Sequence, residues 1–358
     1  MIGALAWLSA MILAGCARAD FVLKPWNGVD EWNATGETKC DWLDVKWRGH
    51  RYRQCVRPYY DWVSNFMKKE QGVWRDCVPL LHLWHKSHPF GSDLFVDVGA
   101  NIGACTMLIA SANNNISTIA FEPNPHNLFY FTRSLTMNPS INRRVELYPY
   151  GLGERLARFP IYMEMGNAGN SVLGPLVLKR HRSRAAGVAE AAPLDAAFIL
   201  NERRVRVMKM DVQGFEVNVL RGSHHLLSSR RVGCFKFEAE RNLLAAVNTS
   251  VAELFGTFER YGYVILSLEK TQMKLTSMHH RNDGSTAMIS YDAAHPTRPA
   301  RPGRLRLLRV HGRADESLAT GSYYCAAYTR HIRGTRRLSL VTSQYYGTHR
   351  PAAIAIHM

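Results

Sequence analysis

The chain has 358 residues, of which 46% are hydrophobic and 21% are charged. These fractions are ordinary for a globular protein, and they exclude a mainly disordered, collagen-like or coiled-coil chain. Seven cysteines are too sparse in this length for a small scaffold held by disulfides. The 45 Lys and Arg residues against 29 Asp and Glu residues give a formal net charge of +16, which favours encounters with polyanions.

The N-terminal residues 1–17 carry no charge, and Ala17-Arg18-Ala19 has the small-x-small form of a cleavage site. We therefore predict a signal peptide over residues 1–19 and a mature protein in the secretory pathway lumen or secreted. Two alternatives stay open: an uncleaved segment that anchors the protein in a membrane, and a buried first helix. No run after Asp20 approaches the roughly 20 apolar residues of a membrane span, so membrane contact would involve the N-terminal segment alone.

Residues 20–90 are rich in Trp, Tyr and His and follow no clean hydrophobic period, which predicts an irregular, partly helical extension. In an oxidising lumen, two of its cysteines at positions 40, 55 and 77 could form a disulfide. The remaining cysteines of the chain body lie in apolar runs, and we expect them to be buried free thiols: Cys105, Cys234 and Cys325.

From residue 94 onwards, short apolar runs alternate with stretches of helical pattern. This alternation indicates βαβ units and a parallel sheet covered on both faces, with the carboxyl ends of its strands along one ligand-binding edge. The segments 151–204 and 270–320 interrupt the pattern and are predicted excursions. The predicted strands are 94–98, 117–121, 145–150, 205–210, 234–237, 263–268 and 323–328, the last two forming an antiparallel hairpin; the predicted helices follow Gly99 to about 112 and cover 125–137, 213–227 and 250–261.

The stretch Phe95-Val-Asp-Val-Gly-Ala-Asn-Ile-Gly103 places a glycine turn between the first strand and a helix. The turn directs backbone N–H groups at the ligand-binding edge, and its two glycines are expected to let a ligand approach the main chain. Glu122 follows the second strand, where an acidic side chain can accept hydrogen bonds from both hydroxyls of a ribose. These features predict a nucleoside-containing cofactor, and a plain tight turn with a solvated Glu122 is the alternative.

Two nucleoside cofactors fit such a frame. A dinucleotide requires G-x-G-x-x-G, whereas this chain has Asn101 at the second glycine of the pattern and lacks the third. S-adenosylmethionine carries a sulfonium and no phosphate, and Asp97 at the strand end suits its cationic groups better than it suits a pyrophosphate. The residues therefore favour S-adenosylmethionine.

Four blocks of sequence resemble the FkbM-type methyltransferases, a branch of the class I S-adenosylmethionine-dependent fold. The most distinctive block is Lys209-x-Asp211-Val-Gln-Gly-Phe-Glu216 followed by Leu220-Arg-Gly222. The resemblance extends over about residues 92–270, with a last strand at 323–328. The four blocks are FVDVGANIGACTMLIA at 95–110, AFEPNPHNL at 120–128, APLDAAF at 192–198 and VMKMDVQGFEVNVLRGSHHLL at 207–227.

This resemblance implies an α/β, Rossmann-like fold with a seven-stranded, mostly parallel sheet, a terminal antiparallel hairpin and helices on both faces. Together with the sequence pattern, it divides the chain into a signal peptide or anchor at 1–19, an N-terminal extension at 20–90, a methyltransferase domain at 91–333 and a basic tail at 334–358, of which only the methyltransferase domain has a counterpart in the family. It also implies in-line methyl transfer from S-adenosylmethionine to a hydroxyl of a carbohydrate or similar small acceptor. The residues that it assigns to the cofactor are Asp97, Gly99, Asn101 and Gly103 at the amino acid end, Glu122 at the ribose, Pro123 and Asn124 in the ribose loop, and Asp195 near the adenine or below the next strand.

Methylation of a sugar hydroxyl requires alignment and a group that lowers the pKa of the hydroxyl. In the family's strand order, Asp211 and Glu238 follow neighbouring strands, and Glu216 opens the next helix, so these three carboxylates are the candidate bases or acceptor ligands. Alternatively, Glu216 caps its helix and Glu238 pairs with a surface arginine. We predict no metal site, although the same carboxylates would be its ligands. The alternative bases are His126, His181, His224 and His225.

Arginines gather late in the chain, between residues 298 and 313 and again between 330 and 337. Aromatic residues are nearly absent from 290–320, which argues against binding of single-stranded nucleic acid. We expect either a solvated basic segment or an acidic or sulfated glycan as partner. Two other functions stay open: an RNA-directed methyltransferase that uses the basic segments, and a non-catalytic module of the same fold that binds glycans or polyanions.

Overall fold

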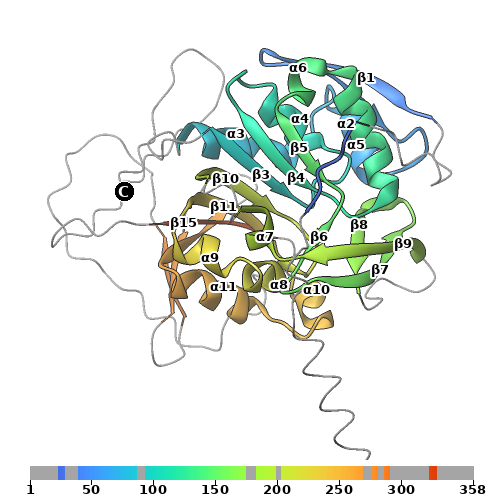
Figure 1. Ribbon diagram of the computed structural model, residues 1–358. Coiled ribbons are helices and arrows are strands. Elements are labelled where there is room, and N and C mark those ends of the chain that lie inside the picture. The colour runs from blue at the N-terminus through green and yellow to red at the C-terminus, as the bar shows by residue number, and fades with distance from the viewer. Residues whose placement is uncertain are drawn as a thin grey trace, which may run out of the picture.

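The computed structural model consists of a central sheet with helices on both faces and a smaller sheet at its side (Figure 1). The predicted signal peptide, the arginine-rich segments and the basic tail at 334–358 lie outside the described residues. Among the helices of the described part, none combines the length and apolar character of a membrane span. The structure describes residues 23–28, 39–86, 93–174, 183–198, 203–268, 276–280, 286–290 and 322–328.

The central sheet contains nine strands in the order β14-β13-β12-β15-β11-β10-β3-β4-β5. The five strands from β11 to β5 are parallel to one another, and Phe95 at the sheet centre pairs with Val207 on one side and Thr118 on the other. The carboxyl ends of these five strands therefore share one edge, as predicted. Their bounds are β3 Leu94–Val98, β4 Ser117–Phe121, β5 Val145–Tyr148, β10 Val205–Met210 and β11 Val232–Ala239.

The antiparallel part of the sheet confirms the predicted hairpin and corrects the strand number. Strand β15 (Ser322–Tyr328) inserts between β11 and β12 (Tyr263–Leu268) and is antiparallel to both. Beyond β12, β13 (Thr276–His280) and β14 (Thr286–Ser290) add two further antiparallel strands. The prediction of seven strands is therefore wrong by this β13–β14 pair, which lies in a segment without a clear apolar pattern.

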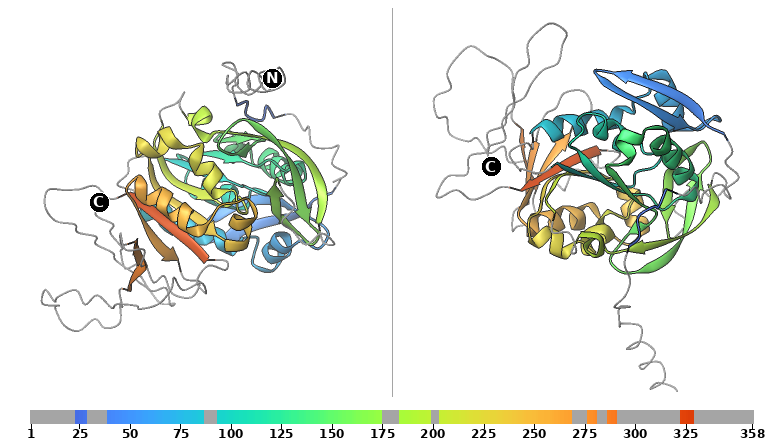
Figure 2. Two further views of the ribbon diagram at one scale, coloured as in Figure 1. Left: turned by 90° about the horizontal axis from the view of Figure 1, so that it is seen from below. Right: turned by 45° about the horizontal axis from the view of Figure 1, so that its top comes forward.

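The central sheet has an apolar core on each of its two faces. Successive side chains of a strand point to opposite faces of the sheet, so neighbouring residues contribute to different cores. Phe95 packs with residues of the helices on one face, whereas its neighbour Val96 packs with those of the other. Figure 2 shows these two layers of helices around the sheet. One layer contains α3 Val78–Lys86, α4 Ala104–Ala110, α5 Pro125–Met137 and the short α6 Pro139–Asn142; the other contains α7 Leu194–Phe198, α8 Glu216–Arg221, α9 His224–Ser228, α10 Arg241–Ala246 and α11 Val251–Arg260.

Local signals start the longer helices where the sequence predicts. At α5, Asn124 accepts a hydrogen bond from the His126 N–H and Pro125 occupies the first turn. At α11, Ser250 caps the N-terminus by accepting from the Glu253 N–H. The predicted helix 213–227 is instead two short helices, α8 and α9, since a Cβ at Gly222 would lie 2.0 Å from the Gly153 carbonyl oxygen. This close packing fixes the break between them.

The excursion at 151–204 forms a second sheet, which we call the insert sheet, with strand order β6-β9-β7-β8. Its own small core includes Ile161, Met163 and Leu173, and it joins the main body through Phe215. Strand β8 pairs antiparallel with β7 and turns towards the N-terminal part of the chain. The strands are β6 Gly151–Leu152, β7 Ala157–Glu164, β8 Asn167–Leu173 and β9 Ser183–Ala192.

The N-terminal segment, residues 39–86, is more regular than predicted. It begins with an antiparallel pair, β1 (Asp41–Trp47) and β2 (His50–Val56), and continues through α2 (Trp62–Lys69) and the 3-10 turn η2 (Arg75–Cys77) into α3. Its apolar residues share a core with α4 and α5. The helical part of the prediction is confirmed by α2, η2 and α3. The prediction of an irregular chain is wrong for residues 39–86, because the buried and exposed residues of β2 alternate only partly and gave no clear period.

One disulfide lies within this segment and another joins the segment to the sheet-forming domain. Cys40 pairs with Cys55 across the β1–β2 pair, and Cys77 pairs with Cys105 of α4. The expected pairing within the N-terminal segment is thus confirmed, but the prediction that Cys105 is a free thiol is wrong. Cys234 is also disulfide-bonded, which overturns the same prediction for that residue. An apolar neighbourhood indicates burial and does not exclude a disulfide.

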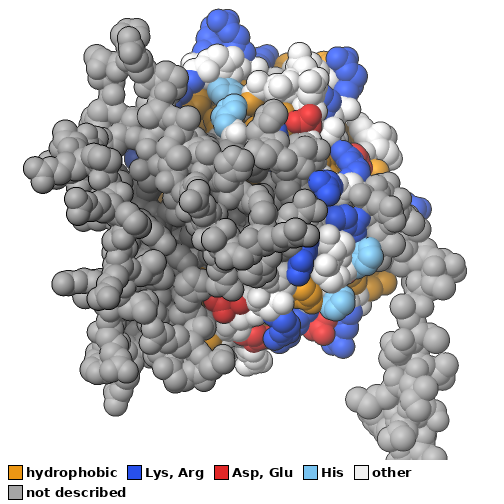
Figure 3. Space-filling view, turned by 90° about the vertical axis from the view of Figure 1, so that its left-hand side faces the viewer, with side chains coloured by type: hydrophobic (Ala, Val, Ile, Leu, Met, Phe, Trp, Pro, Cys, Tyr) orange, Lys and Arg blue, Asp and Glu red, His pale blue; other side chains and the backbone are white. Residues whose placement is uncertain are grey.

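Basic side chains on the described surface are mixed with other types. In the space-filling view, Lys and Arg lie among acidic, hydrophobic and uncharged groups over the described part of that face (Figure 3). Several basic residues pair with carboxylates, such as Arg203 with Glu146 and Arg221 with Glu253. The described surface in this view therefore offers a mixed field rather than one continuous basic patch.

Candidate functional site

A pocket opens at the carboxyl edge of the parallel strands, between the main body, the insert sheet and the N-terminal segment. The empty space among its lining residues amounts to about 820 Å³ when the open mouth is included. Its wall includes the turn after β3, the end of β4 and the end of β10. Residues from each of the three regions line it, among them Ala100, Glu122 and Asp211 of the main body, Gly169 and Leu173 of the insert sheet, and Val63 and Trp74 of the N-terminal segment.

The turn after β3, which we call the cofactor loop (residues 99–103), is fixed by the strand beside it. The N–H groups of Gly99 and Ala100 both donate to the Phe121 carbonyl at 3.0 Å. Gly99 has φ +77°, and a Cβ there would lie 2.0 Å from the Asp211 carbonyl oxygen. At Gly103, with φ +80°, a Cβ would lie 2.1 Å from the Phe131 ring. Both glycines are therefore required by packing within the protein. Gly99 also lines the pocket, and the approach of a ligand to its main chain stays a prediction.

Glu122 points at the cofactor loop. One carboxylate oxygen accepts from the Asn101 N–H at 2.7 Å, and the other accepts from the Asn124 N–H at 2.8 Å and from the Asn127 side-chain amide at 3.1 Å. Only 4% of the residue is exposed. Burial raises the pKa of Glu122, while the three N–H donors and the charge of Lys209 act in the opposite direction. The carboxylate is thus held in one position beside the pocket, where the predicted ribose contact would be made.

Asp97 does not line the pocket. Its carboxylate, fully buried, accepts from Thr106 Oγ1 at 2.8 Å and from Lys209 Nζ at 3.1 Å. Lys209 also donates to the Gly99 carbonyl at 2.7 Å and lies on the pocket wall. Burial opposes the charge of Lys209, but the attraction of Asp97, Asp211 and Glu122 outweighs it and raises the pKa of the amine. Asp97 therefore acts through Lys209, which supports the cofactor loop from below.

The other residues predicted at the cofactor shape the loops around it. Asn101 has φ +54°, and its side-chain oxygen accepts from the Ile102 N–H. Asn124 caps α5 and donates to Ser171 Oγ of the insert sheet at 2.8 Å. Pro123 lies on the pocket wall. Asp195 lies elsewhere: it accepts from the N–H groups of His225 and Leu226 and so caps α9, in line with a supporting role.

The opposite end of the pocket carries the predicted carboxylates after β10 and β11. Asp211 lines the pocket, and Gln213 Nε2 lies 2.8 Å from its carboxylate and 3.4 Å from that of Glu238. Burial raises the pKa of Glu238 to about 8, with further contributions from Asp211 and Glu216. Lys236 lies two residues before Glu238 on β11, and burial lowers the pKa of its amine to about 8. Proton affinities near neutrality are what acid–base chemistry requires.

Glu216 is oriented away from this role. Its Oε1 accepts from the N–H groups of Val212 and Gly214, and the residue is 2% exposed and absent from the pocket wall. Burial raises the pKa of its carboxyl to about 7. The geometry favours the structural alternative for Glu216, which braces the turn between β10 and α8. Among the described residues, no histidine lines the pocket and no group of acidic, His or Cys side chains has the arrangement of a metal site.

Comparison with known proteins identifies the domain that builds this pocket. Residues 97–265 match the family described as Methyltransferase FkbM domain. These residues form an FkbM-type methyltransferase domain. The match runs from the end of β3 to β12 and so contains the cofactor loop, Glu122 and the carboxylates of the opposite end. The N-terminal segment lies outside it.

A curated relative supports the same assignment. A protein named Methyltransferase 1 from the fungus Beauveria bassiana is 28% identical over 151 residues, which are 37% of this chain and 60% of the relative. This chain thus spans less than two thirds of the relative's length. Among solved structures, an FkbM methyltransferase from Methylobacillus flagellatus has a TM-score of 0.33 at 18% identity, covering 56% of this chain and 44% of that one. An S-adenosylmethionine-dependent O-methyltransferase from Thermotoga maritima has a TM-score of 0.38 at 10% identity, covering 84% and 82%.

The family assigns S-adenosylmethionine as the cofactor, and the donor set of the methyltransferase domain fits it. A buried carboxylate, Glu122, lies beside the pocket to receive hydroxyl groups, as a ribose requires. Backbone of the cofactor loop and the Lys209–Asp97 pair lie next to it. A dinucleotide would need the glycine pattern that binds a pyrophosphate, but Asn101 stands at its second glycine. In the described part of the pocket wall the one basic side chain is Lys209, which is paired with Asp97.

Three pocket residues of consequence escaped the sequence reasoning. Lys209 stands in the most distinctive block of the resemblance, two residues before Asp211, so its place near the end of a predicted strand was a usable signal. Asn127 follows Glu122 by five residues and lines the pocket. Trp74 belongs to the N-terminal segment, and no signal in the sequence connects it with the methyltransferase domain because the contact is formed only on folding.

Proposed function

We propose that this chain is an S-adenosylmethionine-dependent O-methyltransferase that methylates a hydroxyl of a carbohydrate or similar small acceptor. The observation that carries the proposal is the continuity of the pocket. One wall runs from Glu122 after β4, the ribose candidate, past the cofactor loop after β3 to Asp211 and Gln213 after β10. A hydroxyl bound at the second end would therefore lie in the same enclosure as a nucleoside bound at the first.

Catalysis in this proposal consists mainly of placing two molecules and accepting a proton. When bound, S-adenosylmethionine supplies a methyl group already activated by the sulfonium. Glu122 and the cofactor loop bind the nucleoside end, and Lys209 keeps the loop in place. Asp211 would accept the hydrogen bond of the acceptor hydroxyl and take its proton as the oxygen gains the methyl group and the methyl–sulfur bond breaks, which leaves the demethylated cofactor as the second product. Asp211 is favoured as base because it lines the pocket and is 26% exposed in its side chain.

Glu238 has a supporting part in this arrangement. Its pKa of about 8 keeps it largely protonated at neutral pH, so it is a poor base there. Gln213 links it to Asp211. A neutral Glu238 adds no negative charge beside Asp211. Its proton can be transferred after each turnover, when Asp211 returns to its charged form.

The acceptor class is supported by the lining of the second end. Trp74 offers an aromatic face held by an edge contact with Phe66, whose ring centroid is 5.0 Å away. Carboxylate and amide groups of Asp211 and Gln213 lie on the same pocket wall. A sugar presents both kinds of surface, a C–H face for an aromatic ring and hydroxyls for polar groups. An acidic or sulfated glycan stays part of the proposal through the net charge of +16.

The proposed compartment is the secretory pathway or the exterior. Two described disulfides, Cys40–Cys55 and Cys77–Cys105, together with the bonded Cys234, support an oxidising environment. A cleaved N-terminus after residue 19 is part of this proposal, and membrane anchoring by that segment is the alternative. N-terminal sequencing of the protein from its native source distinguishes the two.

The proposal is tested in two steps with the intact protein. Calorimetry measures the affinity for S-adenosylmethionine and for its demethylated product; absence of binding for both would remove the proposal. Single-turnover assays with a radiolabelled methyl donor then follow label into extracted glycans, with extracted RNA and small-molecule extracts as parallel acceptors. Label in nuclease-sensitive material would favour the RNA alternative, and glycan binding without label would favour the non-catalytic module.

The identity of the base is tested by Asp211→Asn and Glu238→Gln. We expect Asp211→Asn to abolish transfer while cofactor binding persists, and Glu238→Gln to keep most of the activity near neutral pH. If Glu238 were the base, the rate would instead rise with pH through about 8 and vanish in Glu238→Gln.

A further inference from the structure

Arg57 follows β2 in the N-terminal segment. Its side chain is fully buried. Asp61, itself 1% exposed on its side chain, lies 3.6 Å from Arg57 Nη1, and the ring of Tyr130 lies 4.8 Å from the guanidinium carbon. Two of its nitrogens, Nε and Nη1, have no hydrogen-bond acceptor. A buried guanidinium with incomplete partners is costly to the fold, so its position calls for a functional reason.

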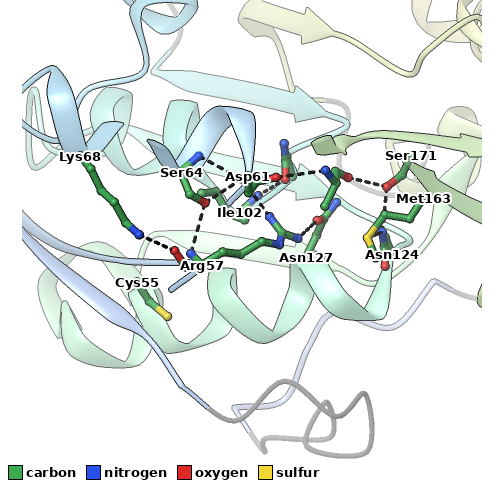
Figure 4. Close-up of polar contacts among 12 residues, drawn as sticks. Cys55, Arg57, Asp61, Ser64, Lys68, Ile102, Asn124, Asn127, Met163 and Ser171 are labelled. Atoms are coloured by element: carbon green, nitrogen blue, oxygen red, sulfur yellow. Dashed lines mark hydrogen bonds and ion pairs between the residues drawn. The ribbon is translucent and has the colours of Figure 1, made fainter. Parts of the chain in front are cut away.

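The third nitrogen of Arg57 makes a directed contact with the methyltransferase domain. Nη2 donates to the side-chain oxygen of Asn127, at 2.5 Å (Figure 4). A guanidinium can only donate, so the oxygen of the Asn127 amide must face Arg57 and its NH₂ group must face the other way. That NH₂ group donates to Glu122 Oε1 at 3.1 Å. Arg57 therefore fixes the direction in which Asn127 donates.

Asp61, the partner of Arg57, also contacts the insert sheet, which forms part of the pocket wall. One oxygen of Asp61 accepts from the N–H and the hydroxyl of Ser64 at the start of α2. The other accepts from the Ala168 N–H of β8 at 3.0 Å, one residue before Gly169 of the pocket wall. The Arg57–Asp61 pair is thus the point at which the N-terminal segment, α5 and the insert sheet meet (Figure 4).

We propose that Arg57 is a positioning residue of the cofactor site: through Asn127 it holds the Glu122 carboxylate as an acceptor for the ribose hydroxyls of S-adenosylmethionine. The N-terminal segment, which lies outside the matched family domain, then completes the site. This inference rests on the proposed function. It predicts that cofactor affinity depends on Arg57, a fully buried side chain that is absent from the pocket wall.

The decisive variant is Asn127→Asp, which keeps an acceptor for Arg57 but removes the donor to Glu122. It also places a second carboxylate beside Glu122. We expect the dissociation constant for S-adenosylmethionine to rise about tenfold or more at pH 7, the usual consequence of losing a hydrogen bond to a charged group. Arg57→Lys should weaken binding in the same direction, because an ammonium cannot keep the forked contact. Arg53→Gln is the matched control: it lies on β2 with 44% of its side chain exposed and should bind as the wild type does.

A pH series separates positioning from general damage. The charged groups that face Glu122 are Lys209 of β10, with its partners Asp97 and Asp211, and Arg57 beyond Asn127. Losing the Asn127 donor raises the pKa of Glu122 further, so affinity in Asn127→Asp should fall more steeply than in the wild type as the pH is lowered from 8 to 6. A merely structural lesion would lower affinity equally across this range.

Each outcome of the calorimetry decides something. Weaker, more pH-dependent binding in Asn127→Asp and weaker binding in Arg57→Lys, with wild-type unfolding curves, support the inference. Wild-type affinity in both variants overturns it and leaves the proposed function intact. A wild-type protein that binds neither S-adenosylmethionine nor its product overturns the proposed function and this inference with it. Should Asn127→Asp fail to fold, Asn127→Ser with Arg57→Lys provides the same comparison.

Discussion

The two ends of the pocket hold their carboxylates in opposite ways. Glu122 receives three N–H donors from the protein and stays in one place. Asp211 and Glu238 share a single amide, that of Gln213. Burial raises the pKa of Glu238 to about 8, and the charge of Asp211 adds to this shift. One end is therefore built to bind a ligand in a fixed pose and the other to exchange protons. Lys209 and Gly99 connect the two ends, so substitutions there should have the largest effects.

The largest effect is expected from Lys209→Met. The change leaves the buried Asp97 carboxylate without its ion pair and removes the ammonium group that lies 3.8 Å from the Asp211 carboxylate. Removing one partner of a buried pair costs about 3–5 kcal/mol of the free energy of unfolding. Urea denaturation measures it, with Arg53→Met in an exposed pair as control. An unchanged midpoint would mean that the two ends are not coupled through Lys209.

Gly99→Ala should come next. A Cβ there meets the Asp211 carbonyl oxygen at 2.0 Å in a backbone conformation with φ +77°. Either the cofactor loop or the end of β10 must move, and we expect a loss of about 2–3 kcal/mol of stability. Gly256→Ala in α11 is the matched control, because open space surrounds it; it should gain about 0.5–1 kcal/mol. Equal effects of the two substitutions on unfolding would contradict this packing argument.

Glu122→Gln sharpens the description of the binding end. Both carboxylate oxygens of Glu122 accept hydrogen bonds from N–H groups of the protein. In the Gln variant an NH₂ group replaces one of these oxygens, so that a donor faces a donor at this position. We expect affinity for S-adenosylmethionine to fall by about 10–100-fold, with smaller effects on stability. Calorimetry checks the expectation, and Glu146→Gln on β5, outside the pocket wall, is the control. Undiminished affinity would place the ribose elsewhere.

The smallest effect concerns the pH dependence of stability at the acceptor end. Glu238 has a pKa of about 8 in the folded protein against 4.5 ordinarily, so the folded state binds the extra proton between these values. Stability from this group is therefore full below about pH 4.5 and is lost as the pH rises through about 8. In Glu238→Gln we expect a flatter decline of the free energy of unfolding between pH 5 and 8, measured by urea denaturation. Glu190→Gln, exposed on β9, should follow the wild-type curve.

Much of the central sheet follows from the sequence because buried parallel strands are continuous apolar runs. The bounds of β3, β4, β10 and β12 agree with the predicted 94–98, 117–121, 205–210 and 263–268. The break between α8 and α9 was missed, because it depends on Gly153 lying against Gly222. The hairpin of the N-terminal segment was missed as well, since its pattern is only partly alternating.

For the candidate site, local sequence indicates which chemical groups stand at the strand ends. Glu122 and Asp211 are at the pocket as predicted, whereas Asp97, Asp195 and Glu216 are occupied by internal partners. Whether a carboxylate faces a ligand or a helix N-terminus depends on which donors the rest of the chain brings near it. A motif alone does not contain that information.

The amino-acid sequence by itself determined the order of strands and helices and the acidic and glycine positions at one sheet edge, because these follow from hydrophobic period and local turn chemistry. Only the tertiary structure decided that residues 39–86 and the insert sheet wall the same pocket, that Cys77 bonds to Cys105, and that Arg57 reaches Glu122 through Asn127. These contacts join residues far apart in the chain, and their energies depend on burial that exists only after folding.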